Sequence, residues 1–289
     1  MRRFELLMPT SLDEASRLLR EREGDVKLIA GGASLLILMK SGVYQPSCLV
    51  SLQRIPGLAD VHFDPGEGLR IGALTTHRVI ERSPVVRERL PVLSEMARMV
   101  ANVRIRNTGT IGGNLCQADS HADPPPLLLA LGARVRAKGG KGTRTIPLEE
   151  FLLDYYQTAL QPDEVVTEVA VPPLPAGSTA AYLRHTVRSA EDFPCIGAAA
   201  VVEWQDGICR QVRLVLGGVA AVPQRARQAE ALARGRSLTE PLIGQMAEAA
   251  AEEVEPISDF YGSAWYKKRM AGVFARRVLL AAWAQRTGR

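Results

Sequence analysis

Short apolar runs alternate with stretches of helical periodicity along the first part of the chain. The runs that predict buried strands lie at residues 26–30, 48–52, 69–74, 133–137, 143–146 and 165–171. A capping box, or apolar residues recurring at i, i+3, i+4 and i+7, predicts helices. These helices lie at residues 11–22, 34–40, from about 77 onward, and at 91–100. Residues 104–126, dense in Gly, Asn, Asp and Pro, predict a long loop. The alternation predicts two α/β subdomains, at about 1–58 and 59–176.

The pattern changes after Pro172-Pro173-Leu174-Pro175-Ala176-Gly177, where stacked prolines end a strand and predict a stiff connector. Three strand-like runs follow, at residues 180–187, 196–204 and 212–219. Three helical stretches then close the chain, at residues 223–233, 241–254 and 263–286. Strands followed by helices predict an α+β domain. We place this domain at residues 177–289.

The composition is that of a globular protein. The 289 residues are 46% hydrophobic and 23% charged, enough to form a substantial core. No apolar run approaches the ~18 residues that a membrane-spanning helix needs, and the N-terminus shows no signal-peptide pattern. The four cysteines lie far apart, a spacing typical of reduced thiols in the cytoplasm. We therefore expect a mature cytoplasmic protein with no membrane span.

The net charge of +5 raises the question of nucleic-acid binding. The 36 Lys and Arg residues are interleaved with 31 Asp and Glu residues. Aromatic residues, on which bases stack, make up only 5% of the chain. This pattern favours a solvated surface rich in arginine. We expect no nucleic-acid partner.

No catalytic or metal-binding motif is evident. The four histidines show no H-E-x-x-H spacing, and His121 with Asp123 is more typical of a pair in a surface loop than of a metal site. No Ser-His-Asp or Cys-His arrangement can be assembled, and no carboxylate pair indicates acid–base chemistry. Gly139-Gly140-Lys141-Gly142-Thr143 departs from the P-loop pattern and predicts a hairpin turn. We expect neither a catalytic residue nor a metal ligand on this chain.

Two diglycine segments carry the strongest chemical signal: Ala30-Gly31-Gly32-Ala33-Ser34 and Thr110-Ile111-Gly112-Gly113-Asn114. The first lies between a predicted strand and a predicted helix. A diphosphate needs backbone N–H groups that converge with no side chain in the way, and glycine meets that steric need. Ser34 and Thr110 add hydroxyl groups. A single diglycine is most often an ordinary turn. The presence of two leaves a nucleotide-cofactor site and a pair of turns as alternatives.

The same segments resemble a known family. Leu28-Ile29-Ala30-Gly31-Gly32-Ala33-Ser34-Leu35-Leu36, followed by Met39-Lys40, is similar to the first flavin loop of the FAD-binding medium subunits of molybdenum hydroxylases. The segment from Arg104 to Cys116, with Asn107, Gly109 and the second diglycine, then Asp123-Pro124-Pro125, resembles their second loop. The resemblance runs from about Phe4 to Ala284. The group includes carbon monoxide dehydrogenase and xanthine dehydrogenase.

The resemblance implies a fold and a set of partners. The fold is α+β: a PCMH-type FAD-binding domain of two subdomains, over residues 1–176, then a small C-terminal domain with a three-stranded antiparallel sheet and helices. FAD is held noncovalently. A separate large molybdopterin subunit oxidises the substrate, and [2Fe-2S] clusters of a small subunit pass electrons to the flavin. FAD then passes them to an external acceptor. The implied assembly is a heterotrimer or a dimer of heterotrimers.

The resemblance also implies the cofactor-binding residues. Those around the two loops are Leu28, Ile29, Ala30, Gly31, Gly32, Ala33, Ser34, Leu35, Thr110, Ile111, Gly112, Gly113 and Asn114. Those elsewhere are Ala101, Asp123, Val166, Arg184 and Phe193. Arg184 and Phe193 are expected near the isoalloxazine ring, and Arg184 stands where relatives often have Lys. No iron–sulfur cluster is expected on this chain.

Two other functions stay open. The first is a flavin-dependent oxidase that acts alone on the same type of fold. It would need its own substrate pocket and acid–base group, and only about 110 residues follow Pro175. The second is a nucleotide-binding scaffold without redox activity. A visible spectrum of the purified chain separates the scaffold from both flavin functions.

Overall fold

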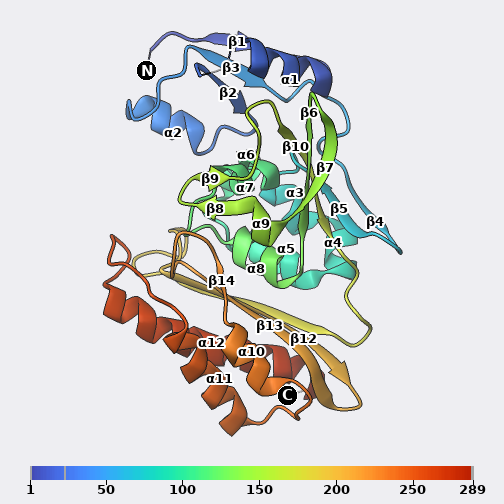
Figure 1. The fold of residues 1–289 in the computed structure, drawn as a ribbon, viewed down its shortest axis with the longest axis vertical. Coiled ribbons are helices and arrows are strands. Elements are labelled where there is room, and N and C mark those ends of the chain that lie inside the picture. The colour runs from blue at the N-terminus through green and yellow to red at the C-terminus, as the bar shows by residue number, and fades with distance from the viewer. Residues whose placement is uncertain (1, 23, 288–289) are drawn as a thin grey trace.

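The computed structural model describes residues 2–22 and 24–287. Three β-sheets follow one another along the longest axis of the molecule (Figure 1). We call the parts built around them the N-terminal unit (β1–β3), the central unit (β4–β10) and the C-terminal unit (β11–β14). The two termini lie at opposite ends of the ribbon.

The N-terminal unit is a parallel sheet with strand order β1-β3-β2. Its strands are β1 (Glu5–Leu7), β2 (Val26–Ile29) and β3 (Cys48–Ser51), and its helices are α1 (Leu12–Glu21) and α2 (Leu35–Lys40). The predicted helix cap at Ser11 is confirmed, with the return bond of the capping box shifted by one residue to Thr10. Ser11 accepts from the Glu14 amide, and the Glu14 carboxylate reaches back to the Thr10 amide at 2.9 Å.

The central unit is an antiparallel sheet with strand order β4-β5-β10-β6-β7. The strands are β4 (Val61–Asp64), β5 (Gly68–Gly72), β6 (Arg134–Gly139), β7 (Gly142–Pro147) and β10 (Val165–Val171), with a separate β8 (Leu152–Asp154) and β9 (Gln157–Thr158) pair. The helices are α3 (His77–Arg82), α4 (Pro84–Arg89), α5 (Pro91–Met99), α6 (Val103–Thr108), α7 (Ile111–Gln117), α8 (Pro124–Ala130) and α9 (Leu148–Phe151). The Lys141 segment lies in the β6–β7 turn, so the predicted hairpin is confirmed.

The expectation of a long loop at residues 104–126 is wrong, because α6, α7 and the first turn of α8 occupy most of it. These helices are too short to show periodicity, and their ends are fixed by caps. The Asn102 side chain accepts from the amides of Arg104 and Ile105, at 3.0 and 3.1 Å. Thr110 accepts from the Gly113 amide at 3.1 Å. Pro124, Pro125 and Pro126 form the first turn of α8, where a missing backbone N–H breaks no hydrogen bond within the helix.

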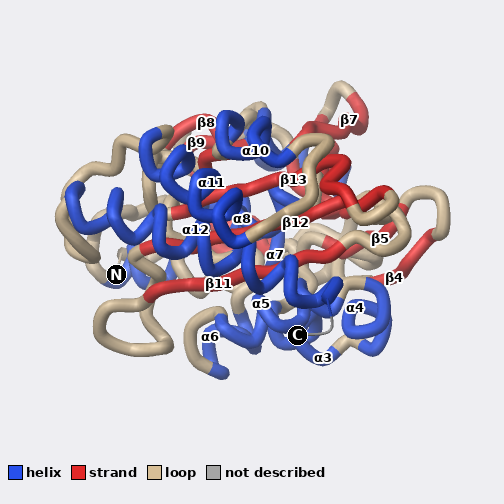
Figure 2. The backbone as a smooth tube through the Cα atoms, turned by 90° about the horizontal axis from the view of Figure 1, so that it is seen from below, coloured by secondary structure: helices blue, strands red, loops and turns tan. Residues whose placement is uncertain are grey.

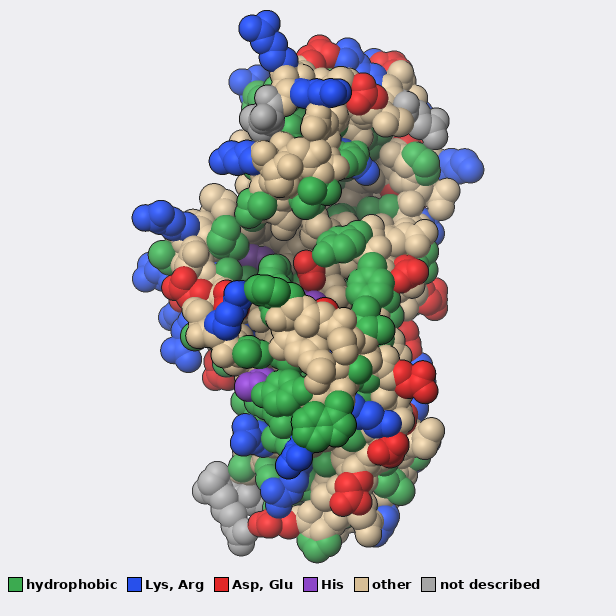
Figure 3. Space-filling view, turned by 90° about the vertical axis from the view of Figure 1, so that its left-hand side faces the viewer, with side chains coloured by type: hydrophobic (Ala, Val, Ile, Leu, Met, Phe, Trp, Pro, Cys, Tyr) green, Lys and Arg blue, Asp and Glu red, His purple; other side chains and the backbone are tan. Residues whose placement is uncertain are grey.

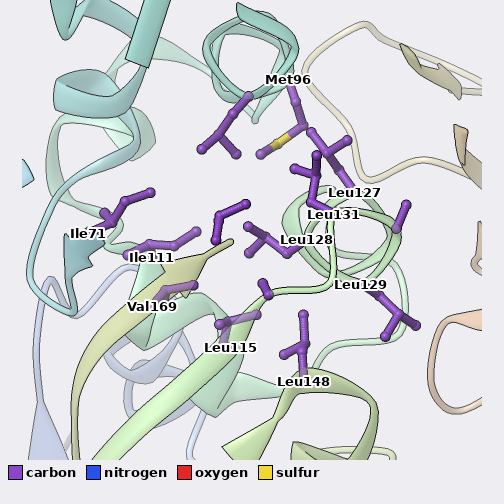
Figure 4. Packing of buried hydrophobic residues seen from close by; sticks show 14 of the residues in the cluster. Ile71, Met96, Ile111, Leu115, Leu127, Leu128, Leu129, Leu131, Leu148 and Val169 are labelled. Atoms are coloured by element: carbon purple, nitrogen blue, oxygen red, sulfur yellow. The ribbon is translucent and has the colours of Figure 1, made fainter. Parts of the chain in front are cut away.

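The core of the central unit lies between α5, α7, α8 and the sheet (Figure 4). Ile71 and Val169 come from the sheet, Met96 from α5, and Ile111 and Leu115 from α7. All are fully buried. α7 packs this deeply because Gly112 has no side chain: a Cβ there would lie 2.6 Å from the Ala73 Cβ. The second diglycine is therefore in part a packing feature.

The C-terminal unit is an antiparallel sheet covered by helices (Figure 2). Its strands are β11 (Thr179–His185), β12 (Ile196–Gln205), β13 (Ile208–Gly217) and β14 (Gln224–Arg225), and its helices are α10 (Arg227–Ala233), α11 (Glu240–Glu252) and α12 (Ala264–Thr287). β14 adds a two-residue strand to the three expected, and it takes up the start of the helix predicted from residue 223. No helix within residues 2–22 and 24–287 is long and apolar enough to cross a membrane.

Alternating residues of β12 join the C-terminal unit to the central one. Ala199 and Val201 belong to the core shared with α8, whereas Ala198 and Ala200 belong to the core under α10–α12. Close approach of α8 depends on glycine, since a Cβ on Gly217 would lie 2.7 Å from Pro126. This interface sets the position of the segment between β11 and β12, which contains Asp192 and Phe193, relative to the central unit.

Candidate functional site

A cleft of about 870 Å³ opens where the three units meet. Figure 3 shows it as a hollow between the upper part of the molecule and its middle. Its walls come from β2 and the loop before α2, from residues 100–117, and from Asp192 and Phe193 of the C-terminal unit. Ligand-binding clefts have volumes of about 300–1,000 Å³. The size is therefore that of a cofactor site.

The loop of residues 30–35, here the first loop, offers backbone donors. The amides of Gly31, Gly32, Ala33 and Ser34 donate to no acceptor within the described parts of the chain. Gly32 has φ +72°, a left-handed conformation that costs glycine no strain. Successive free N–H groups form a concavity that binds anions. The first loop therefore has the donors that its sequence predicts.

Residues 109–114, here the second loop, comprise the N-terminal turn of α7 and the two residues before it, and their amides differ from those of the first loop. The Ile111 and Gly112 amides donate to the Thr75 and Ala73 carbonyls at 3.0 and 2.9 Å. The Gly113 amide donates to Thr110 Oγ1. The expectation of converging free amides at both diglycines is therefore wrong for this one. What the second loop offers the cleft is side chains: the Thr110 hydroxyl, and Asn114, whose buried Oδ1 has no partner among the described residues.

The two loops touch each other. A Cβ on Gly31 would lie 1.6 Å from the Thr108 carbonyl oxygen, and one on Gly113 would lie 3.6 Å from the Ala30 Cβ. Only glycine at position 31 lets the first loop lie against the chain just before the second. Both loops consequently line one cleft.

Most of the residues expected at a cofactor site line this cleft. They are Leu28, Ile29, Ala30, Gly31, Gly32, Ala33, Ser34, Leu35, Ala101, Thr110, Gly112, Gly113, Asn114, Asp123, Val166 and Phe193. Ile111 and Arg184 do not line it. The Ile111 side chain is fully buried in the central core (Figure 4).

The Arg184 guanidinium is engaged by protein groups. It donates to the Met99 and Asp192 carbonyls, and at 3.1 Å to Asp123 Oδ2. Tyr182 donates to the other Asp123 oxygen at 2.8 Å. Burial raises the pKa of Asp123 to about 6, although Arg184 and Tyr182 act in the opposite direction. Arg184 thus lies behind the cleft wall and joins the C-terminal unit to it.

Sequence reasoning missed His77, which lines the cleft beside the second loop. Its backbone amide donates to the Gly109 carbonyl at 3.0 Å. The ring is only 2% exposed, and Nδ1 has no partner among the described residues. Burial, with a smaller effect of Arg106, lowers its pKa to about 4, so the ring is neutral at pH 7. The sequence signal that could have found it is its position shortly after the predicted strand at residues 69–74, where a strand leads into a helix.

Within the described residues, no group of three or more His, Cys, Asp or Glu side chains could hold a metal ion. His121 instead bonds to the Pro194 carbonyl at 2.8 Å and to Asp259 Oδ2 at 2.9 Å. Asp259 also accepts from the buried Lys267. This network fastens the 119–123 segment to the C-terminal unit.

Comparison with known proteins decides the family. Residues 2–174 match the model for the FAD binding domain in molybdopterin dehydrogenase. Residues 181–282 match the model for the CO dehydrogenase flavoprotein C-terminal domain. The chain belongs to the family of FAD-binding subunits of molybdopterin dehydrogenases. The resemblance seen in the two loops is thereby confirmed, and so is the expected fold class.

Relatives match over nearly the whole chain. The 6-hydroxypseudooxynicotine dehydrogenase complex subunit alpha of Paenarthrobacter nicotinovorans is 37% identical over 96% of this chain and 94% of its own. The carbon monoxide dehydrogenase medium chain of Hydrogenophaga pseudoflava is 36% identical over 98% of both. A solved carbon monoxide dehydrogenase structure from that organism has a TM-score of 0.94, with 39% identity and 98% coverage of each chain. Quinoline 2-oxidoreductase from Pseudomonas putida 86 has a TM-score of 0.92, with 32% identity, over 99% of this chain and 98% of that one.

The chain is therefore the FAD-binding subunit of a molybdenum hydroxylase-type dehydrogenase, an oxidoreductase component whose cofactor is FAD. The residues present fit that cofactor. The first loop supplies unpaired amides for an anionic diphosphate, and Gly31 and Gly32 leave space that a side chain would fill. The orphaned Asn114 Oδ1 is a buried acceptor in the same cleft, which suits a hydroxyl or N–H group of the cofactor, not a phosphate oxygen.

Proposed function

We propose that this chain is the electron-transfer medium subunit of a three-component dehydrogenase. Its partners are a large molybdopterin subunit, which oxidises the substrate, and a small subunit with [2Fe-2S] clusters, in a heterotrimer or a dimer of heterotrimers. FAD supplies the step from one-electron donors to an external acceptor. The observation that carries the proposal is the cleft, in which free amides and an orphaned acceptor meet walls from all three units.

The cleft-lining residues divide the work of holding FAD. The amides of Gly31, Gly32, Ala33 and Ser34 bind the diphosphate together with the Thr110 hydroxyl, and Asn114 Oδ1 accepts from a donor group elsewhere on the cofactor. Ala101, Val166 and Phe193 lie along other walls and contact the rest of the cofactor. Asp123 and Arg184 hold the Asp192–Phe193 segment in place. In this division Arg184 acts through its neighbours, which revises its expected place beside the ring.

Two features support a subunit over an oxidase that acts alone. Relatives that match over at least 94% of their own length are named as a subunit or medium chain of larger enzymes. The cleft is also of cofactor size, so FAD would fill it. The domain division at residues 1–176 and 177–289 belongs to the proposal and is supported by the separate sheets. The cytoplasmic location is supported by the four free cysteines.

The test compares the chain alone with the assembled complex. The purified full-length chain should bind one FAD and be reduced by dithionite, yet turn over no organic substrate. Co-expression with a large molybdopterin subunit and a small [2Fe-2S] subunit of this family should give a complex that passes electrons from substrate to a dye. Steady oxidation of a substrate by the chain alone would overturn the subunit function in favour of the oxidase.

A matched pair of variants tests whether electrons pass through FAD on their way to the external acceptor. Gly32→Val puts a side chain into the first loop at φ +72° and should remove FAD. The complex with this variant should still reduce its iron–sulfur clusters with substrate but lose transfer to the external acceptor. Gly244→Val, in α11 with open space around it, is the control and should behave like the unmodified chain. Unchanged transfer without FAD would contradict the proposal.

A further inference from the structure

The turn between α5 and α6 is an unusual part of the cleft wall. Val100 and Ala101 both line the cleft. Ala101 has φ +41°, a conformation that a residue with a Cβ rarely adopts. Such a conformation persists only where the surrounding structure imposes it. Something must therefore hold this turn.

Two arginines with largely buried side chains hold it. Arg106 Nη1 donates to the Val100 carbonyl at 3.1 Å and to the Ala101 carbonyl at 2.8 Å. Arg184, from the C-terminal unit, donates to the Met99 carbonyl. Three successive carbonyl groups are thus bound by guanidinium groups from two different units.

Arg106 is itself anchored away from the cleft. Its Nε donates to Glu81 Oε2 at 3.2 Å, and its side chain is 13% exposed. Arg78 donates to the other Glu81 oxygen at 2.8 Å. Neither Arg106 nor Glu81 lines the cleft. Arg106 therefore makes no direct contact with a molecule bound in the cleft, and the turn is the part of the cleft wall to which it is hydrogen-bonded.

The fixed carbonyls leave the amides of the same turn available. The Ala101 and Asn102 N–H groups donate to no acceptor within residues 2–22 and 24–287. Ala101 lines the cleft and Asn102 does not, so the unpaired Ala101 amide is the one available as a donor to a ligand there. An isoalloxazine ring carries carbonyl oxygens and unprotonated ring nitrogens that accept such bonds.

We propose that Arg106 is a positioning residue for the flavin: with Glu81 behind it, it holds Ala101 in its left-handed conformation and so places the free Ala101 amide against the cofactor. The inference rests on the proposed function, because it requires FAD in this cleft. Arg184 fixes the same turn from the C-terminal side. Packing of the two units is thereby coupled to the shape of the flavin site.

The test is a variant series on the full-length chain. Arg106→Gln should raise the Kd for FAD at least about tenfold, the effect of losing a charge-assisted hydrogen bond. It should also shift the flavin absorption band and midpoint potential. Arg104→Gln, on the exposed face of the same helix, is the control and should leave all three readouts unchanged.

A second change separates positioning from a direct effect of charge. Glycine adopts positive φ without strain. Ala101→Gly should therefore restore most of the affinity and the potential in the Arg106→Gln background. Circular dichroism checks folding. If Arg106→Gln does not fold, Arg106→Lys and Glu81→Gln replace it, each weakening the clamp while keeping the buried site filled, and each should be rescued by Ala101→Gly.

The outcomes are distinct. A folded Arg106→Gln protein with unchanged affinity and potential overturns the inference. A loss that Ala101→Gly fails to restore overturns it too, because Arg106 would then act other than through the turn. An unmodified chain that binds no FAD at all overturns the proposed function, and the inference with it.

Discussion

The two diglycine loops share a dipeptide but differ in what their backbone amides bind. In the first loop, the amides of residues 31–34 have no acceptor within the described chain. In the second, the amides of residues 111–114 all donate to protein oxygens, and Gly112 serves a tight packing contact with Ala73. A diglycine therefore indicates close approach of the backbone to something. Only the hydrogen bonds around it show whether that something is a ligand or the protein itself.

The largest expected effect tests this difference directly. Gly31→Ala places a Cβ 1.6 Å from the Thr108 carbonyl oxygen, and because neither a Cβ nor a backbone oxygen can rotate out of the way, the loops must separate. We expect the Kd for FAD to rise more than about 100-fold, which is about 2.7 kcal/mol. Equilibrium dialysis or flavin fluorescence measures it.

The control is the other diglycine. Gly112→Ala overpacks the core against Ala73, so it should lower the free energy of unfolding by about 1–3 kcal/mol while the Kd for FAD changes only a few-fold. Urea unfolding of the FAD-free protein gives the first value. If Gly112→Ala loses FAD as completely as Gly31→Ala, the two loops are not different in kind.

The contrast also explains what the sequence revealed. Apolar runs such as 48–52 and 165–171 form largely buried strands. They could be predicted because short runs of apolar, β-branched residues are typical of strands buried on both faces. The glycines of both loops were found because close backbone approach requires glycine at particular positions. Both signals are local, and local signals are readable from a single chain.

What could not be predicted depends on long-range contacts. The helices in residues 103–130 are set by caps such as Asn102 and by packing on Ala73, and neither leaves a periodic pattern. The direction of the Arg184 side chain depends on Asp123 and on carbonyls of two distant segments. His77 gave only a weak signal, since one histidine after a strand is common.

A second prediction concerns His77, which lies on the second-loop side of the cleft. Burial lowers the pKa of the ring to about 4, from 6.5 in the unfolded chain. The neutral ring is favoured in the fold, so the stability it contributes is present above pH 6.5 and is lost as the pH falls toward 4. The difference corresponds to about 3 kcal/mol.

The measurement compares the unmodified chain with His77→Asn, whose amide stays neutral throughout. Urea unfolding at several pH values between 7.5 and 4 should show the unmodified chain losing more stability than the variant. Contributions from carboxylates cancel in the difference. Parallel pH profiles would show that the ring is solvated in the folded protein. The second-loop side of the cleft would then be accessible to water, contrary to the buried position of His77.

The smallest expected effect compares one hydroxyl group from each loop. Thr110 Oγ1 caps α7 by accepting from the Gly113 amide, so Thr110→Val should lower the free energy of unfolding by about 1 kcal/mol. Ser34 makes no side-chain cap bond, so Ser34→Ala should leave stability within about 0.5 kcal/mol. Its effect should fall instead on FAD affinity, because the hydroxyl lies among free amides. Thr110→Ser keeps the cap and serves as the control for the first change. If Ser34→Ala destabilises the FAD-free protein as much as Thr110→Val does, the first loop also has a structural role, and the difference between the two loops is one of degree.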